Sequence, residues 1–200
     1  MKGAISLTEE LITWAECEAI SKDLMANAAD FEEAMLEKLS NMQGLYFMCY
    51  TGTELGGTLW KAPEPAIIYI GRAGKDSPRH WRNDTGVSTV RRSLAAMLAN
   101  SLQLTSVPNQ NPDADDADRY SNYALTAESE EKLTDWMKHN IRISFWEMGP
   151  EKIEAAYHGL INFNTPKLNF QDNPNNTFGQ QIKSYRKLLI DMAASYEAEK

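Results

Sequence analysis

The sequence predicts an α+β fold, in which a small antiparallel β-sheet of about three strands is flanked by helices and follows an N-terminal helical extension. Two short apolar runs, at residues 44–50 and 66–71, have the composition of strands and lie close to glycine. A third segment, 141–146, alternates in the manner of a strand. Helical segments surround these runs, and this mixture of elements favours a sheet packed between helices.

The first part of the chain, residues 1–42, is expected to form the helical extension, and residues 43–200 the main domain. Two helices are predicted within 8–42. Thr8 with its following glutamates caps the first, and Asp30 starts the second. The second helix carries an apolar stripe made of Met35, Leu36, Leu39 and Met42.

The centre of the chain combines an irregular connection, two helices and a loop. Gly56, Gly57 and two prolines mark irregular structure between the first two strands. Ser88 is expected to cap a helix over 87–103, and a further helix is predicted over 128–139. The polar, proline-containing stretch between them, 105–127, is predicted to be a long loop.

The C-terminal part is predicted to contain two helices. The first runs from Glu151 to Ile161 and stops before Pro166. Thr177 and Gln180 have the spacing of a capping box for the second. The apolar face of this last helix is formed by Phe178, Ile182, Tyr185, Leu189, Met192 and Tyr196.

Composition indicates a globular protein of the reducing cytoplasm. The chain has 200 residues, 42% of them hydrophobic and 24% charged, which is enough for one well-buried domain. No apolar run approaches the roughly 20 residues that span a bilayer, and the N-terminus lacks the layout of a signal peptide. Cys17 and Cys49 are expected to be buried and reduced, and their spacing does not suggest zinc.

The charge is unevenly distributed. The net charge is −8, and residues 1–43 alone carry 3 basic and 9 acidic side chains, a balance of −6. Residues 66–104 carry 6 basic and 2 acidic side chains, a balance of +4. The positive charge suits a local phosphate site, whereas the acidic N-terminal helices could recruit a protein partner.

Two tyrosines and a basic stretch form the main functional candidate. Tyr46, in QGLYFMCYTG, and Tyr69, in AIIYIGRAG, are expected on neighbouring strands of one hairpin. The second is followed at once by a group of basic side chains, namely Arg72, Lys75, Arg79, His80 and Arg82. Phenols beside guanidiniums suit phosphate chemistry, because nearby cations favour the phenolate of Tyr46 and arginine matches phosphate oxygens. Either tyrosine alone would more often be a core aromatic.

Together with a late glutamate and an asparagine after a proline, these motifs resemble the GIY-YIG nuclease family over roughly residues 43–190. The resemblance extends to STVRRSLAAML and LTDWMKHNIRISF. It implies that Tyr46 and Tyr69 are the motif tyrosines. It also implies that Glu154 binds a single divalent metal ion, Mg²⁺ or Mn²⁺, and that Asn169 helps to hold the site and its phosphate.

The sequence departs from this family in the position of its phosphate-binding arginine. The family usually places an arginine four residues before the histidine, where this chain has Asp76. Arg79 or Arg82 is therefore expected to bind the scissile phosphate, with Arg79 preferred. Arg91 is expected to contact a DNA phosphate. His80 is either a proton relay or a surface residue, and His158 either joins Glu154 at the metal or makes a surface contact.

The resemblance implies a metal-dependent DNA endonuclease. A tyrosine would assist the attacking water, an arginine would hold the phosphate, and the metal held by Glu154 would assist the leaving group. The alternative keeps the same fold without strong catalysis. In that case the protein is a regulatory module that binds nucleic acid or a protein.

Overall fold

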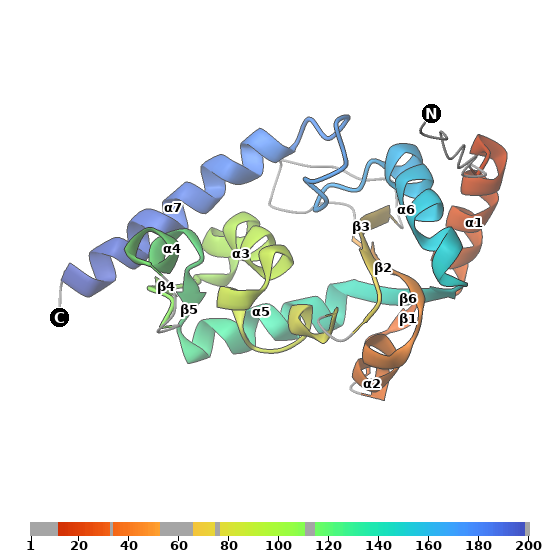
Figure 1. The fold of residues 1–200 in the computed structure, drawn as a ribbon. Helices are drawn as coiled ribbons and strands as arrows, with labels where there is room; N and C mark the ends of the chain where they lie inside the picture. The colour runs from red at the N-terminus through yellow and green to blue at the C-terminus, as the bar shows by residue number, and fades with distance from the viewer. Residues whose placement is uncertain (1–11, 33, 53–65, 75–76, 111–114, 199–200) are drawn as a thin grey trace, which may run out of the picture.

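The computed structural model describes residues 12–32, 34–52, 66–74, 77–110 and 115–198. Figure 1 shows that the four-stranded sheet lies toward one end of the molecule and the C-terminus at the other. The helices are α1 Trp14–Ala26, α2 Ala34–Asn41, α3 Thr89–Leu102, α4 Asp116–Ser121, α5 Ala127–Asn140, α6 Pro150–Asn164 and α7 Gly179–Ala198. The strands are β1 Ala29–Asp30, β2 Gly44–Tyr50, β3 Ala66–Arg72, β4 Ser106–Val107, β5 Ala124–Leu125 and β6 Ile141–Glu147, and 3₁₀ turns occur at η2 Ser77–His80 and η3 Thr85–Val87.

The main sheet is antiparallel and has the strand order β1-β6-β2-β3. This confirms the α+β prediction and the three predicted strands, and β1 adds a short fourth. Every residue of β2 is buried, because this strand is central and both of its faces are covered. Strand β3 is an edge strand, and the functional candidates cluster around that edge.

Each face of the sheet has its own hydrophobic cluster. On one face Tyr46 and Ile68 pack with α3, α5 and α7, whose residues include Leu94 and Ile182. On the other face the cluster contains Phe47, Ile67 and Ile70 together with residues of α1 and α6. In Figure 1, α1 and α6 accordingly lie beyond the sheet from α3 and α5.

The N-terminal segment contributes to both the sheet and the core. Thr13, rather than the predicted Thr8, which lies outside the described residues, forms a capping box with Glu16 at the start of α1. The prediction that Asp30 starts the second helix is wrong, because Asp30 belongs to β1 and pairs with Arg142 of β6. A two-residue strand has no periodicity of its own, so only its distant partner reveals it. The boundary at 42/43 stays a prediction.

The segment predicted as a long loop, 105–127, contains regular structure among its described residues. Strands β4 and β5 pair as a second, two-stranded antiparallel sheet, and α4 lies between them in the chain. The Ser106 hydroxyl donates a hydrogen bond to the Leu189 carbonyl of α7 at 2.6 Å. This small sheet is therefore held by α7, a tertiary contact that local composition does not reveal.

In the second half of the chain, the helix boundaries agree with prediction for α3 and α5 and differ near the C-terminus. Ser88 caps α3 as predicted. Helix α6 continues to Asn164 and ends where Thr165 takes a left-handed conformation, with φ 46°. Helix α7 begins at Gly179, and the Phe178 amide before it donates to Asn176 rather than joining a Thr177 cap.

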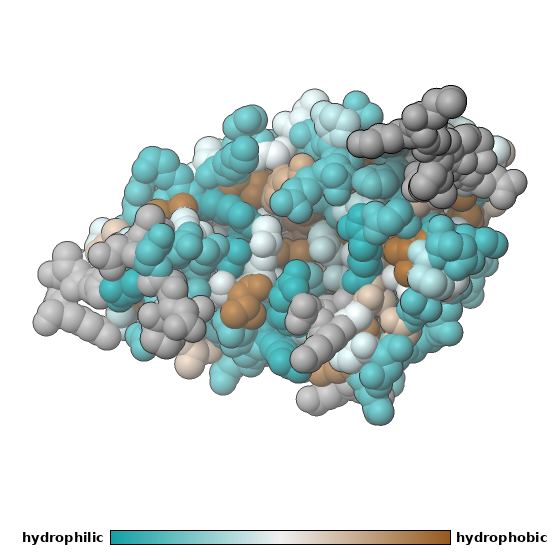
Figure 2. Space-filling model, viewed as in Figure 1, coloured by the Kyte–Doolittle hydropathy of each residue, from teal (hydrophilic) through white to brown (hydrophobic). Residues whose placement is uncertain are grey.

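The surface and the cysteines agree with the composition. Cys17 and Cys49 are both buried and free, as predicted. Figure 2 shows a mostly hydrophilic face with small, separate hydrophobic patches. None of the helices among the described residues has the length and apolar character that crossing a bilayer requires.

Candidate active site

A cavity of about 310 Å³ lies at the β3 edge, where η2, α3, α6 and the segment after α6 meet. Four of its lining residues are predicted site residues that come from distant parts of the chain. They are Tyr69, Arg79, His80 and Asn169. The fold therefore gathers these four predicted residues at one place.

The two motif tyrosines contact each other, with ring centroids 5.9 Å apart. Tyr46 is 1% exposed and lies behind Tyr69, which lines the cavity. A side-chain hydrogen bond between the two phenols raises the pKa of Tyr46 and lowers that of Tyr69, the pattern expected when Tyr46 is the donor. Only Tyr69 of the pair therefore faces the space in which a substrate could bind.

The two phenols differ in how their surroundings shift the pKa. Desolvation raises the pKa of Tyr46 well above its ordinary value, and the hydrogen bond to Tyr69 adds to that rise. Desolvation also raises the pKa of Tyr69, but the hydrogen bond from Tyr46 and the charges of Arg79 and Arg72 oppose it. The prediction that cations make Tyr46 a phenolate is therefore wrong, because the loss of solvent outweighs them. Burial therefore favours the neutral form of Tyr46.

His80 is 2% exposed, so it is not a surface residue. Its Nδ1 lies 2.7 Å from the hydroxyl of Ser88, the residue that caps α3. Burial, and then the charges of Arg79 and Arg91, lower the pKa of His80 to about 3. A neutral imidazole therefore packs against Tyr69, with ring centroids 5.4 Å apart.

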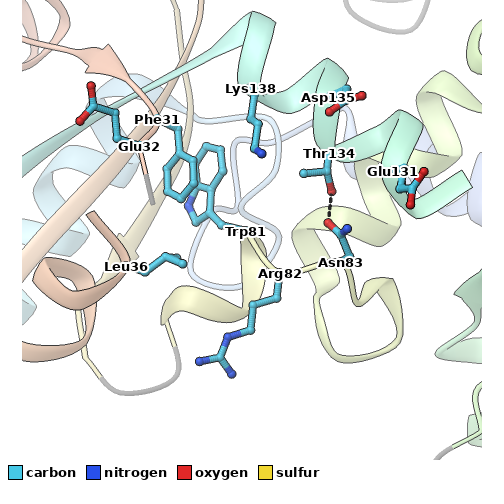
Figure 3. A pocket seen from close by; sticks show the side chains of 10 residues that line it. All are labelled: Phe31, Glu32, Leu36, Trp81, Arg82, Asn83, Glu131, Thr134, Asp135 and Lys138. Carbon is cyan, nitrogen blue, oxygen red and sulfur yellow. Dashed lines mark hydrogen bonds between the residues drawn. The ribbon is translucent and has the colours of Figure 1, made fainter. Parts of the chain in front are cut away.

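The two candidate phosphate arginines lie in different cavities. Arg79 is exposed at the tyrosine cavity, where its guanidinium makes no side-chain hydrogen bond or ion pair with another described residue. Arg82 lines a larger cavity of about 850 Å³, in which the rings of Phe31 and Trp81 stack 4.0 Å apart. Figure 3 shows that this larger cavity contains neither motif tyrosine. Its size therefore does not make it the better active-site candidate.

Glu154 of α6 is joined to Arg72 at the end of β3. Arg72 Nε donates to Glu154 Oε1 at 2.7 Å, and Arg72 Nη2 donates to Oε2 at 2.6 Å. This hydrogen bonding lowers the pKa of Glu154, so the group is a carboxylate. The Arg72 guanidinium also lies 3.7 Å from the ring centroid of Tyr157, a wall of the cavity.

The surroundings of Glu154 fit a metal ion that needs few protein ligands. His158 Nε2 is 3.7 Å from Glu154 Oε2. Within the described parts of the chain, no group of three or more histidine, cysteine or acidic side chains could hold a metal. Mg²⁺ usually keeps several waters and needs only one or two carboxylates, so the single carboxylate of Glu154 fits it.

Asn169 fastens the segment after α6 to the edge strand. Its Oδ1 accepts from Ile70 N at 2.9 Å, and its Nδ2 donates to Ile70 O at 2.8 Å. Leu168 N adds a bond to Ile68 O at 2.9 Å. Asn169 is buried, and its amide is used to hold this segment against β3.

Arg91 does not belong to the site surface. It is 0% exposed, and its Nη2 lies 2.6 Å from Glu130 Oε2. Arg92 is also buried and donates to the Gly86 carbonyl at 2.6 Å. The burial of Arg91 corrects the expectation that it contacts a DNA phosphate and removes it from the candidate DNA contacts. Lys75 lies outside the described residues.

Sequence reasoning missed Tyr157 as a site residue. It lines the cavity, and its hydroxyl lies 3.4 Å from Asn169 Nδ2. The available signal was its position three residues after Glu154, which places both side chains on neighbouring parts of one helix face. The pairing of Arg72 with Glu154 was also missed, because the two residues meet only through packing of α6 against β3.

The edge-strand site combines two contacting phenols, a neutral histidine, an exposed arginine and a carboxylate, which is a set suited to phosphodiester chemistry. The family described as GIY-YIG catalytic domain matches residues 56–188. The chain belongs to the GIY-YIG family, whose members are usually endonucleases that use divalent metal ions. The match includes Tyr69, Arg79, Glu154 and Asn169 and begins after Tyr46. Comparison with curated proteins and with solved structures finds no match.

Proposed function

We propose that the protein is an endonuclease that hydrolyses phosphodiester bonds in DNA with the help of one divalent metal ion. The observation that carries the proposal is the convergence of Tyr69, Arg79 and His80 on one cavity, next to the Glu154 carboxylate. A strand, a 3₁₀ turn and a helix contribute residues to this cluster. The membership of the chain in a family of nucleases supports a catalytic role for it.

Tyr69 is the residue that takes the proton of the attacking water. Tyr69 lines the cavity, and its hydrogen bond with Tyr46 lowers its pKa and so favours the phenolate form. The guanidiniums of Arg79 and Arg72 favour the same form. Tyr46 therefore acts through Tyr69 as a positioning residue, a reversal of the roles that the sequence suggested. His80 is uncharged, and its lowered pKa makes it a weak base, so it does not take the proton of the water.

Arg79 binds the phosphate under attack. Its guanidinium is exposed at the cavity and makes no side-chain hydrogen bond or ion pair with another described residue, so it can bind a phosphate without breaking such a contact. Glu154 is the residue that would hold Mg²⁺ or Mn²⁺, with waters and substrate oxygens as the other ligands. When bound, such an ion stabilises negative charge on the leaving oxygen.

The proposal is tested by incubating the purified full chain with supercoiled, linear and branched DNA and with duplex RNA. Each reaction contains Mg²⁺, Mn²⁺ or EDTA. We expect DNA cleavage with either metal and none with EDTA. Intact DNA in every metal reaction, with a protein that is folded by circular dichroism, would contradict the proposal.

A second function is favoured by one observation. Arg72 occupies both carboxylate oxygens of Glu154, and a site kept in that state would bind nucleic acid without cutting it. The same incubations distinguish the two functions, because a regulatory module would retard the DNA on a native gel and leave it uncut. Acidic side chains of the N-terminal helices would then offer a surface for a protein partner.

A further inference from the structure

Arg72 and a divalent cation would need the same carboxylate. The Arg72 fork engages Oε1 and Oε2 of Glu154 together, at 2.7 and 2.6 Å. A dipositive ion on this carboxylate would lie close to the guanidinium and repel it. Negative coupling of this kind is reciprocal, so each cation weakens the binding of the other.

Arg72 can leave Glu154 without disturbing the core. Its side chain is 40% exposed, and that of Glu154 is 54% exposed. The guanidinium also rests on the ring of Tyr157, 3.7 Å from the centroid, and that ring is a wall of the tyrosine cavity. An arginine that releases Glu154 can therefore stay stacked on Tyr157 and move toward the cavity.

The cavity mouth would then hold two guanidiniums, those of Arg72 and Arg79. Tyr69 and Arg79 line this cavity together with Tyr157, the ring on which Arg72 rests. Two arginine forks match the non-bridging oxygens of a phosphodiester better than one.

We propose that Arg72 holds the Glu154 carboxylate until a divalent cation takes it, and that the displaced guanidinium then binds the phosphodiester beside Arg79. This inference rests on the proposed function. It makes Arg72 a second phosphate-binding residue that becomes available only when the metal is present.

Metal binding without nucleic acid tests the first half. Mn²⁺ affinity is measured by the electron paramagnetic resonance of the free ion for the unmodified protein and for Arg72→Ala, Arg72→Lys and Glu154→Gln. Arg142→Ala is the matched control, because Arg142 also forms an exposed ion pair at the sheet, with Asp30 at 3.1 Å. We expect Arg72→Ala to bind Mn²⁺ about tenfold more tightly, Arg72→Lys to be intermediate, and Arg142→Ala to be unchanged. Glu154→Gln should lose the site.

Salt dependence of DNA binding tests the second half. Affinity for a short duplex is measured over a salt series with and without Ca²⁺, after a gel confirms that the duplex stays intact. Calcium should steepen the slope of the unmodified protein by about one counterion, because one more arginine reaches a phosphate. Arg72→Ala should show no such steepening, and Arg142→Ala should behave like the unmodified protein.

The outcomes separate this inference from the nuclease proposal. Unchanged or weaker Mn²⁺ binding by a folded Arg72→Ala or Arg72→Lys protein overturns the exchange, even if the unmodified protein cleaves DNA. Tighter Mn²⁺ binding together with intact DNA in all reactions supports the exchange and contradicts the nuclease. Equal salt slopes with and without Ca²⁺ would overturn the transfer of Arg72 to the phosphate.

Discussion

Gly71 and Tyr46 are cross-strand partners, and the ring of Tyr46 occupies the space in which a side chain at residue 71 would lie. A Cβ built on Gly71 would overlap Cζ and the hydroxyl oxygen of Tyr46. The two motifs are therefore one packing unit: the glycine of the second makes room for the tyrosine of the first. This arrangement lets the Tyr46 hydroxyl reach Tyr69.

Gly71→Ala is expected to lower the free energy of unfolding by about 1–3 kcal/mol, because the added methyl group overpacks a buried position. Cleavage should fall as well, since the Tyr46 ring must move away from Tyr69. Denaturant unfolding and cleavage rates check both effects. Gly179→Ala is the control for stability, because its Cβ would approach Phe170 to 3.3 Å, a close contact without overlap, at the start of a helix that alanine favours. Similar behaviour of the two variants would contradict this role of Gly71.

Tyr69→Phe and Tyr46→Phe are expected to differ in kind. Tyr69→Phe removes the proton acceptor and should reduce the cleavage rate by about 10²-fold or more. Tyr46→Phe removes a hydrogen bond to Tyr69, so the pKa of Tyr69 should rise, and the rising limb of the pH–rate profile, which reports ionisation of the proton acceptor, should move to higher pH. Its cost in stability should not exceed about 1–2 kcal/mol. A larger activity loss for Tyr46→Phe, with no change in the profile, would reverse the assigned roles.

Arg79→Ala should reduce kcat more than DNA affinity, because a guanidinium on the scissile phosphate contributes most in the transition state. Arg82→Ala, in the separate cavity, should at most weaken binding and lower the salt slope by about one. Single-turnover cleavage and binding over a salt series distinguish these effects. Loss of turnover in Arg82→Ala alone would show that the larger cavity contains the phosphate site.

His80 should make the folded state sensitive to acid. Its pKa is about 3 in the folded protein and about 6.5 when unfolded, so between these values the unfolded chain binds the extra proton. The free energy of unfolding therefore decreases as the pH falls, because the buried His80 stays neutral while the unfolded chain binds a proton. The decrease is about 2 kcal/mol between pH 7 and pH 5. His80→Gln should lack this part of the loss in urea unfolding at the two pH values. An identical loss in both proteins would show that His80 is not buried in its neutral form.

Much of the site was predictable because its residues lie in recognisable local patterns. The apolar runs around Tyr46 and Tyr69 identify neighbouring strands, and the position of Glu154 on an amphipathic segment identifies a helix. Resemblance to a family then placed these residues together. The cavity that joins Tyr69, Arg79 and Asn169 agrees with that expectation.

The remainder depends on contacts between distant segments. Arg91 reads as a solvated helix residue until Glu130 of another helix is seen to bury it. Strand β1 exists only through its pairing with β6, and β4 only through its pairing with β5. The neutral state of His80 likewise follows from burial, which composition cannot supply.

Glu154→Gln tests the central claim, metal-dependent cleavage at the β3 edge, most directly. The exposed pair with Arg72 contributes only about 0–1 kcal/mol, so the variant should stay folded. Glu151→Gln, an exposed glutamate at the start of the same helix, is the matched control. With Mg²⁺ or Mn²⁺, we predict that Glu154→Gln cleaves DNA at least about 10²-fold more slowly, whereas Glu151→Gln cleaves at the unmodified rate. Cleavage at the unmodified rate by a folded Glu154→Gln protein would contradict the account.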